Sequence, residues 1–258
     1  LFTLIVIAAF ADMVAGTFNA YTVVDGQSQL SAAASTNGSA GMVSIMFMVF
    51  AVVFGLIQKK WNLSGWKEAV VGIVFIIASF VIGNYFPIEL GKNAWSYITF
   101  VYIFFAAVLP MWLMKQPRDY MTTFMFIAMI VGAALGLVVA HPSMNLPVYT
   151  GFNNAKLGTM FPILFVTVAC GAVSGFHSLV SSGTSSKTVA NEKDMLKVGY
   201  GAMILESLLA VIALCVAGAA AAADGTAATG TPFQIFSRGV AGFFEMFGVP
   251  VHFATVFM

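Results

Sequence analysis

Long apolar runs alternate with short polar connections along the 258 residues of the chain. A helix of about 20 apolar residues crosses the hydrocarbon core of a bilayer, so each run predicts a membrane span. Short segments of alternating polarity, typical of membrane barrels, do not appear in the sequence, and only helices satisfy the backbone of such uniform runs. The seven predicted spans are Leu1–Tyr21, Met42–Ile57, Glu68–Tyr85, Ala94–Met114, Tyr120–Ala140, Met160–Val180 and Val198–Ala223.

Basic residues in the connections predict the orientation of these spans. Alternate connections carry most of the lysines and arginines, and basic connections remain on the cytoplasmic side. The basic side carries eight residues: Lys59, Lys60, Lys67, Lys115, Arg118, Lys187, Lys193 and Lys197. The other side carries Lys92 and Lys156, so the first span is expected to begin inside and end outside.

Several connections have a recognisable character. Asp25–Gly41 is rich in Ser, Ala and Gly and predicts an outer loop, and the prolines and glycines of His141–Gly158 predict turns. Pro117 and Asp119 predict the start of the fifth span, with Asp119 as its cap. After Pro232, aromatic residues at helical spacing predict an amphipathic helix in the outer interface, with a re-entrant segment as the alternative.

Composition supports membrane class independently of the spans. Hydrophobic residues make up 60% of the chain, charged residues 8%, and the mean hydropathy is +0.95; soluble domains carry about 25% charged residues. The net charge of +1 gives no basic face for nucleic acid. Cys170 and Cys215 lie in apolar runs and are interpreted as small hydrophobes, and no Cys/His spacing predicts a metal site.

Small and hydroxylated residues replace apolar ones halfway along the sixth predicted span. Gly171 and Gly175 form a pair that permits close helix contact, as do Gly132 and Gly136 in the fifth span, where packing is the expected role. Two interpretations of the sixth span remain open: a packed helix whose serines bond back to its own carbonyls, or a helix broken near the membrane middle. His177 favours the second, because a titratable ring in a span usually faces a cavity. One helical face carries Ser174, Ser178, Ser181 and Ser182.

Two carboxylates also lie inside apolar spans. Asp12 is followed by Gly16 and Asn19 at spacings of four and three, so the three would share a helical face. Glu206 lies deep in the seventh span, where it can carry a proton or pair with His177 or Lys187. An unpaired carboxylate in lipid is costly, which makes both residues candidates for function, although interhelical hydrogen bonds or a structural ion pair are the alternatives.

With these residues in view, the chain resembles the carbon-starvation (CstA) family of transporters. The stretches that carry the resemblance are Ala11–Asn19, Leu109–Leu113, Gln116–Tyr120 and the block Ala169–Ala210, which includes Ser174–Thr184, Asn191-Glu192 and Gly199–Gly201. No general physical requirement produces this combination of residues, so the match to the family is specific.

The resemblance implies secondary uptake of small peptides or pyruvate across the bacterial cytoplasmic (inner) membrane, induced in carbon starvation and coupled to a proton or another cation. It implies an all-α bundle of the amino acid–polyamine–organocation type, embedded in membrane lipid, with no cofactor. Family members are longer, so residues 1–258 are expected to be one transmembrane transporter domain that is incomplete at both ends. The opening Leu1–Ala11 lacks the basic leading region of a signal peptide.

A carboxylate substrate would then meet helix ends and hydroxyls of the broken sixth span. The expected substrate-binding residues are Gly171, Ser174, Gly175, His177, Ser178, Ser181, Ser182, Thr184 and Asn19; the expected proton-coupling residues are Asp12, His177 and Glu206. A membrane sensor that binds a small carboxylate without moving it is the alternative function. An enzyme is disfavoured because His177 and Ser178 are adjacent and point about 100° apart on a helix. His141 and His252 are set aside because they lie near span ends without nearby ligands. A channel is disfavoured because no filter or charged ring is visible.

Overall fold

The computed structural model describes residues 2–24, 27–61, 64–147, 149, 151–154, 158–172, 177, 180–220 and 232–258. The chain divides into two compact units. The first consists of Leu1–Ser143 and Ala228–Met258, and the second of Met144–Ala227. That both form one transporter domain stays a prediction.

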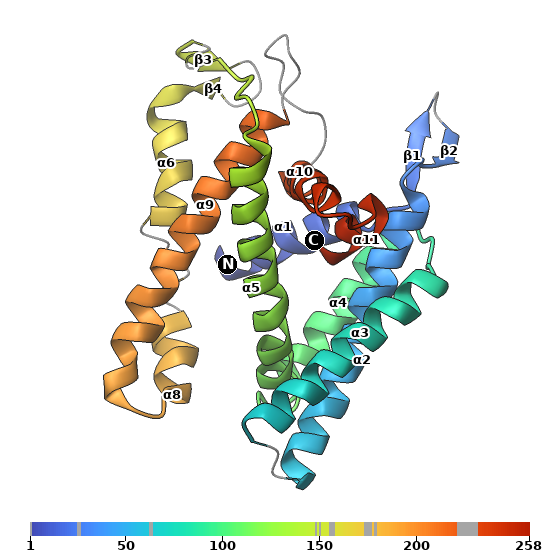
Figure 1. The fold of residues 1–258 in the computed structure, drawn as a ribbon, viewed down its shortest axis with the longest axis vertical. Helices are drawn as coiled ribbons and strands as arrows, with labels where there is room; N and C mark the ends of the chain where they lie inside the picture. The colour runs from blue at the N-terminus through green and yellow to red at the C-terminus, as the bar shows by residue number, and fades with distance from the viewer. Residues whose placement is uncertain are drawn as a thin grey trace. The chain divides into compact units, whose positions relative to one another are not determined.

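A helix occupies each of the seven predicted spans (Figure 1). These helices are α1 (Phe2–Thr17), α2 (Ala34–Trp61), α3 (Trp66–Tyr85), α4 (Lys92–Val108), α5 (Lys115–Ala140), α6 (Met160–Ala172) and α9 (Ala202–Ala219). Within the described residues, four helical stretches are long and apolar enough to cross a membrane: Ala34–Trp61, Trp66–Tyr85, Lys115–Ala140 and Glu192–Ala219. The chain is therefore an all-α membrane protein, while the count of seven spans remains a prediction.

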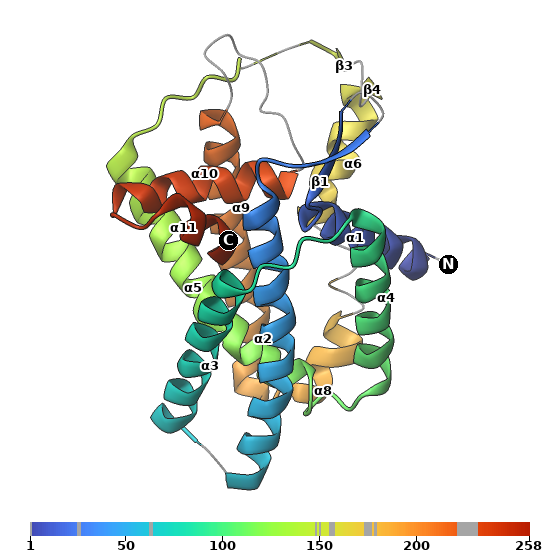
Figure 2. The ribbon, with the colours of Figure 1, turned by 90° about the vertical axis from the view of Figure 1, so that its right-hand side faces the viewer.

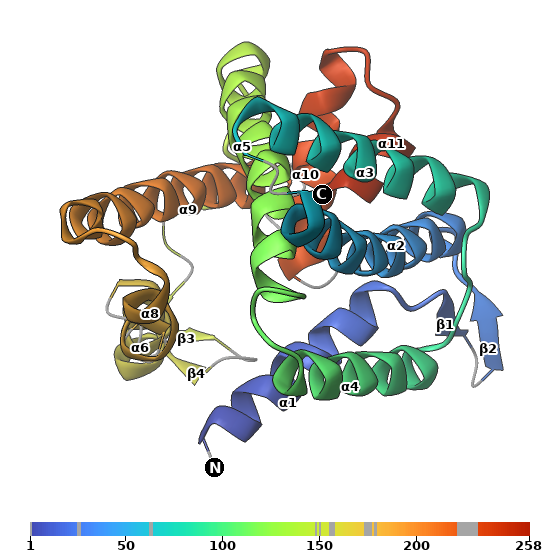
Figure 3. The same ribbon diagram turned by 90° about the horizontal axis from the view of Figure 1, so that it is seen from below.

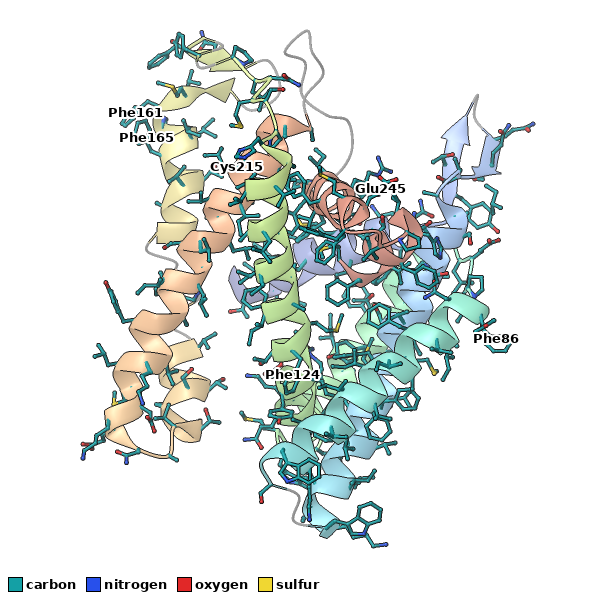
Figure 4. The ribbon with its side chains drawn as sticks, viewed as in Figure 1. Phe86, Phe124, Phe161, Phe165, Cys215 and Glu245 are labelled. Carbon is teal, nitrogen blue, oxygen red and sulfur yellow. The ribbon has the colours of Figure 1, made fainter. Side chains whose placement is uncertain are left out.

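The core of the first unit lies where α2, α3 and α5 meet, and α2 and α3 run side by side (Figure 2). Ala51, Phe54, Ile76 and Met121 form its buried cluster. The Phe54 ring stacks on Tyr120 with centroids 5.9 Å apart, and Tyr120 meets Phe124 edge to face at 5.2 Å (Figure 4). Aromatic pairs of this kind add to the stability that area burial alone provides.

The prediction of an outer loop over Asp25–Gly41 is wrong. Residues Gln27–Leu30 form strand β2, which pairs antiparallel with β1 (Tyr21–Val24), and α2 begins at Ala34. The Asp25-Gly26 dipeptide between them is a strong hairpin signal that the loop prediction overlooked. The small residues of early α2 serve close packing: a Cβ on Gly38 would lie 3.0 Å from the Ile88 carbonyl oxygen, and one on Gly41 would collide with the Trp95 ring.

Two helix ends also differ from prediction. The helix α5 begins at Lys115 without a side-chain cap, so Asp119 does not cap it and Pro117 lies within its first turn. At the other boundary, α4 ends at Val108, six residues before the predicted end, because Pro110 removes a donor and restricts the residue before it.

The amphipathic helix after Pro232 is present as α10 (Pro232–Met246), followed by α11 (Val251–Phe257). Gly248, with φ 84°, adopts the left-handed conformation that commonly ends a helix. The helix α10 packs against α5, where a Cβ on Gly136 would lie 2.5 Å from Phe243 Cβ and one on Gly132 would collide with Phe244. The packing role of this glycine pair is confirmed, whereas the interfacial position of α10 stays a prediction.

The first unit is completed by α1, which packs against α4 and crosses it at an angle (Figure 3). Phe18, just after α1, meets Trp95 of α4 with ring centroids 5.1 Å apart. Since α1 ends at Thr17, it is shorter than its predicted span.

The second unit contains α6 and α9 together with short elements. These are β3 (Asn153–Asn154), β4 (Gly158–Thr159), the π-helix η1 (Ser181–Ser185), α8 (Ser186–Thr188), the 3-10 helix η2 (Glu192–Asp194) and the π-helix η3 (Lys197–Gly201). Phe161 and Phe165 meet edge to face near the start of α6 (Figure 4). The Asn145 amide donates to the Gly218 carbonyl at 3.1 Å, which fixes the start of this unit to the end of α9.

Candidate functional site

His177 and Glu206 face each other within the second unit and form an ion pair when the imidazole is protonated. His177 Nε2 lies 3.7 Å from Glu206 Oε2, and the side chains are 46% and 45% exposed. The two residues come from the segment after α6 and from α9, so the pair joins two helical segments. His177, one of the partners predicted for Glu206 from the sequence, is therefore the partner found in the structure.

The position of Glu206 strengthens the case for function. The continuous helical stretch Glu192–Ala219 has 28 residues and includes η2, η3 and α9. Glu206 lies at its middle, about 20 Å from either end at 1.5 Å per residue. A carboxylate at this depth has no easy route to the surface, so it requires a partner or a polar cavity.

The Gly- and Ser-rich segment is only partly described. The helix α6 ends at Ala172 and includes Gly171. The predicted break, with Ser174, Gly175 and Ser178, lies outside the described residues and stays a prediction. Beyond it, Ser181, Ser182 and Thr184 lie in η1.

Hydroxyl groups at the end of this segment donate hydrogen bonds to backbone carbonyls of the same segment. Ser186 donates to the Ser182 carbonyl at 2.8 Å, and Thr188 donates to the Thr184 carbonyl at 3.1 Å. One interpretation of the sequence expected such bonds from the serines of the sixth predicted span, and for those serines it stays a prediction. Ser181, Ser182 and Gly183 are exposed, and a Cβ on Gly183 would have no atom within 4 Å.

Two π-helices flank the connection between the segment after α6 and α9. The first is η1, with sequence SSGTS, and the second is η3, with sequence KVGYG. Such turns are rare, and they occur frequently at functional sites because they interrupt regular helix packing. Both fall in the block that carries the family resemblance, yet no residue pattern predicted their geometry.

Asp12 is not an isolated charge. Its Oδ1 lies 2.7 Å from Lys92 Nζ at the start of α4. Because α1 ends at Thr17, Asp12 is only five residues from its end, which brings it within reach of a lysine assigned to the outer side. The structure therefore identifies Lys92 as the partner of Asp12, which the sequence analysis did not predict.

The prediction that Asp12, Gly16 and Asn19 share one helical face is wrong for Asn19. Asn19 lies beyond the end of α1, where its side chain accepts from the Tyr21 amide at 3.2 Å and donates to the Tyr21 carbonyl at 2.7 Å. Asparagine bonds its own nearby backbone in this way at turns, so the helix stops before it.

His252 is a polar residue that sequence reasoning set aside. Its Nδ1 lies 3.1 Å from the Thr36 hydroxyl of α2, and its Nε2 lies 2.9 Å from Asn84 Oδ1 of α3. Asn84 uses its amide nitrogen to donate to the Phe80 carbonyl at 2.8 Å, so Oδ1 is its acceptor and Nε2 carries the proton. The only sequence signal was that all three residues fall on the same predicted side.

The remaining polar features are weaker candidates for a functional site. A hollow of about 230 Å³ on α5 is lined by Asp119, Thr122, Thr123 and Phe126. The hydroxyls of Thr122 and Thr123 already donate to the Arg118 and Asp119 carbonyls. Among the residues that the structure describes, no group of three His, Cys, Asp or Glu side chains could hold a metal ion.

Known proteins resemble the chain over 44% to 70% of its length. The pyruvate/proton symporter BtsT of Escherichia coli is 45% identical over 165 residues, 58% of this chain and 23% of the relative. The peptide transporter CstA of Escherichia coli is 50% identical over 117 residues, 44% and 17% respectively. The peptide transporter CstA of Bacillus subtilis is 37% identical over 194 residues, 70% and 32% respectively. No solved structure matches the chain.

The aligned part thus spans a third or less of each of these relatives. The relatives are named as transporters. Together with the apolar helices, this makes the chain a multi-pass inner-membrane protein. The family model described as carbon starvation protein CstA matches residues 1–256. The chain therefore belongs to the carbon starvation protein CstA family.

Proposed function

We propose that the chain is part of a proton-coupled transporter that takes up small peptides or pyruvate across the inner membrane. Relatives named for each substrate support the two classes, and one of them is named as a proton symporter. The proposal includes seven spans in a bundle of the amino acid–polyamine–organocation type, which moves substrate by alternating access. The runner-up is a sensor that binds a small carboxylate without transporting it.

The ion pair between His177 and Glu206 is the observation that carries proton coupling. Protonation of the carboxylate removes its charge and with it the attraction to the imidazolium, so the pair has a closed and an open state. Both side chains are about half exposed within the second unit, so neither is enclosed by packed side chains. The position of Glu206 at the middle of a helical stretch long enough to span a membrane supports a protonation event within the membrane rather than at its surface.

The substrate is proposed to bind at the hydroxylated segment next to this pair. Pyruvate and a peptide C-terminus share a carboxylate, which hydroxyls, backbone amides and helix N-termini can all bind. The proposed contacts are Gly171, Ser174, Gly175, His177, Ser178, Ser181, Ser182 and Thr184, with Asn19 as a further candidate. Asp12 remains a candidate for coupling, although it already faces Lys92.

Uptake by the full-length parent protein in proteoliposomes tests the proposal. Labelled pyruvate and a labelled dipeptide are compared with and without an inward proton gradient, and accumulation of either one under the gradient is expected. Glu206→Gln should remove the dependence on the gradient, whereas the control Glu245→Gln, an exposed carboxylate of α10 (Figure 4), should retain it. If uptake by the Glu206→Gln variant still depends on the proton gradient, Glu206 has no coupling role. If the parent binds pyruvate or the dipeptide without transporting it, the protein is a sensor.

A further inference from the structure

Five basic side chains gather at one end of the first unit. Lys59 and Lys60 end α2, Lys67 begins α3, and Lys115 and Arg118 lie in the first turn of α5. The basic–tryptophan face is defined here as these five residues with Trp61, Trp66 and Trp112. The three indoles are 66%, 72% and 39% exposed, which is unusual for the largest apolar side chain.

The two parts of this face come from segments about 50 residues apart that pack together. A Cβ on Gly55 of α2 would lie 2.7 Å from Pro117 Cγ and 2.9 Å from the Leu113 carbonyl oxygen, so the segment before α5 presses on the end of α2. Lys59 Nζ lies 4.0 Å from the centroid of the Trp112 ring, which is a cation–π contact across the two segments.

Positive charge on the basic–tryptophan face is only partly compensated. The two acidic residues of the same segments are engaged locally: Glu68 accepts a hydrogen bond from Gln58, and Asp119 lies 3.6 Å from Arg118 Nε. Within the described residues, Lys60, Lys67 and Lys115 form no ion pair with a carboxylate. Three exposed ammonium groups therefore remain available to an external anion.

The second unit provides a contrast on the same predicted side of the membrane. Its connection carries Lys187, Lys193 and Lys197, but Lys197 lies 3.5 Å from Asp194, and residues 181–201 contain no tryptophan. Basic residues alone follow from the general rule for cytoplasmic connections. Exposed indoles among unpaired lysines distinguish the basic–tryptophan face.

We propose that the basic–tryptophan face binds the phosphate headgroups of anionic phospholipids in the inner leaflet. Lysine ammonium groups neutralise the phosphates, and indoles prefer the boundary between headgroups and acyl chains, where their ring is buried and their N–H stays hydrated. A soluble anion would use the lysines but would gain nothing from three exposed indoles. The face would hold the inner end of α2, α3 and α5 at a fixed depth, and this inference is independent of what the protein transports.

Lipid binding to the purified full-length parent protein, counted by native mass spectrometry, tests the proposal. Phosphatidylglycerol is titrated against phosphatidylcholine at equal concentration. The test variant is Lys60→Gln/Lys67→Gln/Lys115→Gln, and the matched control Lys187→Gln/Lys193→Gln/Lys197→Gln removes the same charge from the second unit. A second variant, Trp112→Leu, removes the indole without changing charge.

The parent should retain phosphatidylglycerol in preference to phosphatidylcholine. The test variant should lose on the order of a hundredfold in affinity for phosphatidylglycerol, because each of the three lysines that it replaces contributes about fivefold near an anionic surface. The control should lose much less, and Trp112→Leu should lose several-fold with phosphatidylcholine binding unchanged. Equal loss in both triple variants, or no loss in the test variant, overturns the proposal. A variant that fails to fold would lose binding of both lipids, and Trp112→Leu then decides the outcome.

Discussion

Gly83 lies where α3 passes closest to α2, and its replacement by alanine tests how tightly these two helices are locked. A Cβ at this position would lie 2.8 Å from the Val43 amide nitrogen and 3.1 Å from the Ser39 carbonyl oxygen, and it would collide with the Val43 side chain. Residues 39 and 43 are four apart, so these are the two atoms that a helical hydrogen bond joins. Backbone cannot rotate aside as a side chain can, so α3 would have to move away from α2.

The magnitude follows from two opposing terms. Alanine in place of glycine favours a helix by about 1 kcal/mol. Overpacking of a close contact costs about 1–3 kcal/mol, and here the rigid backbone places the cost near the upper end. We expect Gly83→Ala to destabilise the protein by about 1–2 kcal/mol.

Gly72 of the same helix supplies the matched control. It is also buried, but a Cβ there would meet only Tyr120, Met121 and Phe54 at 3.7–3.9 Å, which is ordinary contact. Gly72→Ala should therefore be neutral or stabilise by up to about 1 kcal/mol through helix propensity alone. Thermal unfolding of the detergent-solubilised full-length protein would compare the two variants, and a Gly83→Ala protein as stable as Gly72→Ala would refute the reasoning.

Three further outcomes are expected. If His177 and Glu206 act as one unit, the double variant His177→Gln/Glu206→Gln should reduce proton-driven uptake no more than the worse single variant, and additive losses would show that they act separately. His252→Leu leaves two hydrogen-bonding groups of α2 and α3 unpaired and should lower stability by about 1–3 kcal/mol in thermal unfolding, with His252→Gln milder. Lys92→Gln leaves Asp12 unpaired in an apolar predicted span and should lower the yield of folded protein, and adding Asp12→Asn should restore it; unchanged yield in the single variant would show that the pair is dispensable.

Hydropathy located the helices but not their limits. Each apolar run contains a helix because lipid-compatible residues must satisfy their backbone internally. The boundaries depend on features that hydropathy does not measure, such as Pro110 after α4 or Gly38 and Gly41, whose small size allows α2 to begin early against Ile88 and Trp95. A glycine-rich stretch resembles a loop until its packing partner is known.

The candidate site was predictable by residue type, but its partners only in part: His177 was one of the partners expected for Glu206, whereas Lys92 was not expected for Asp12. Asp12, His177 and Glu206 stand out because charge is rare in these runs. Which of them pair depends on which helices lie side by side, and that contact is set by long-range packing. His252 was set aside because it is near a span end, yet its bonds to Thr36 and Asn84 join three helices.

The two ion pairs of the predicted spans differ in what a proton can do to them. Asp12 faces a lysine, whose ammonium keeps its charge at neutral pH, so neutralising Asp12 leaves an unpaired cation. Glu206 faces a histidine, the side chain whose charge ordinarily changes between pH 5 and 8. Transfer of the imidazolium proton to the carboxylate leaves both partners neutral, and a neutral pair can move between water and a dry site at much lower cost than a charged one. This asymmetry is why we expect proton coupling from the pair in the second unit, with Asp12 and Lys92 fixing α1 to α4.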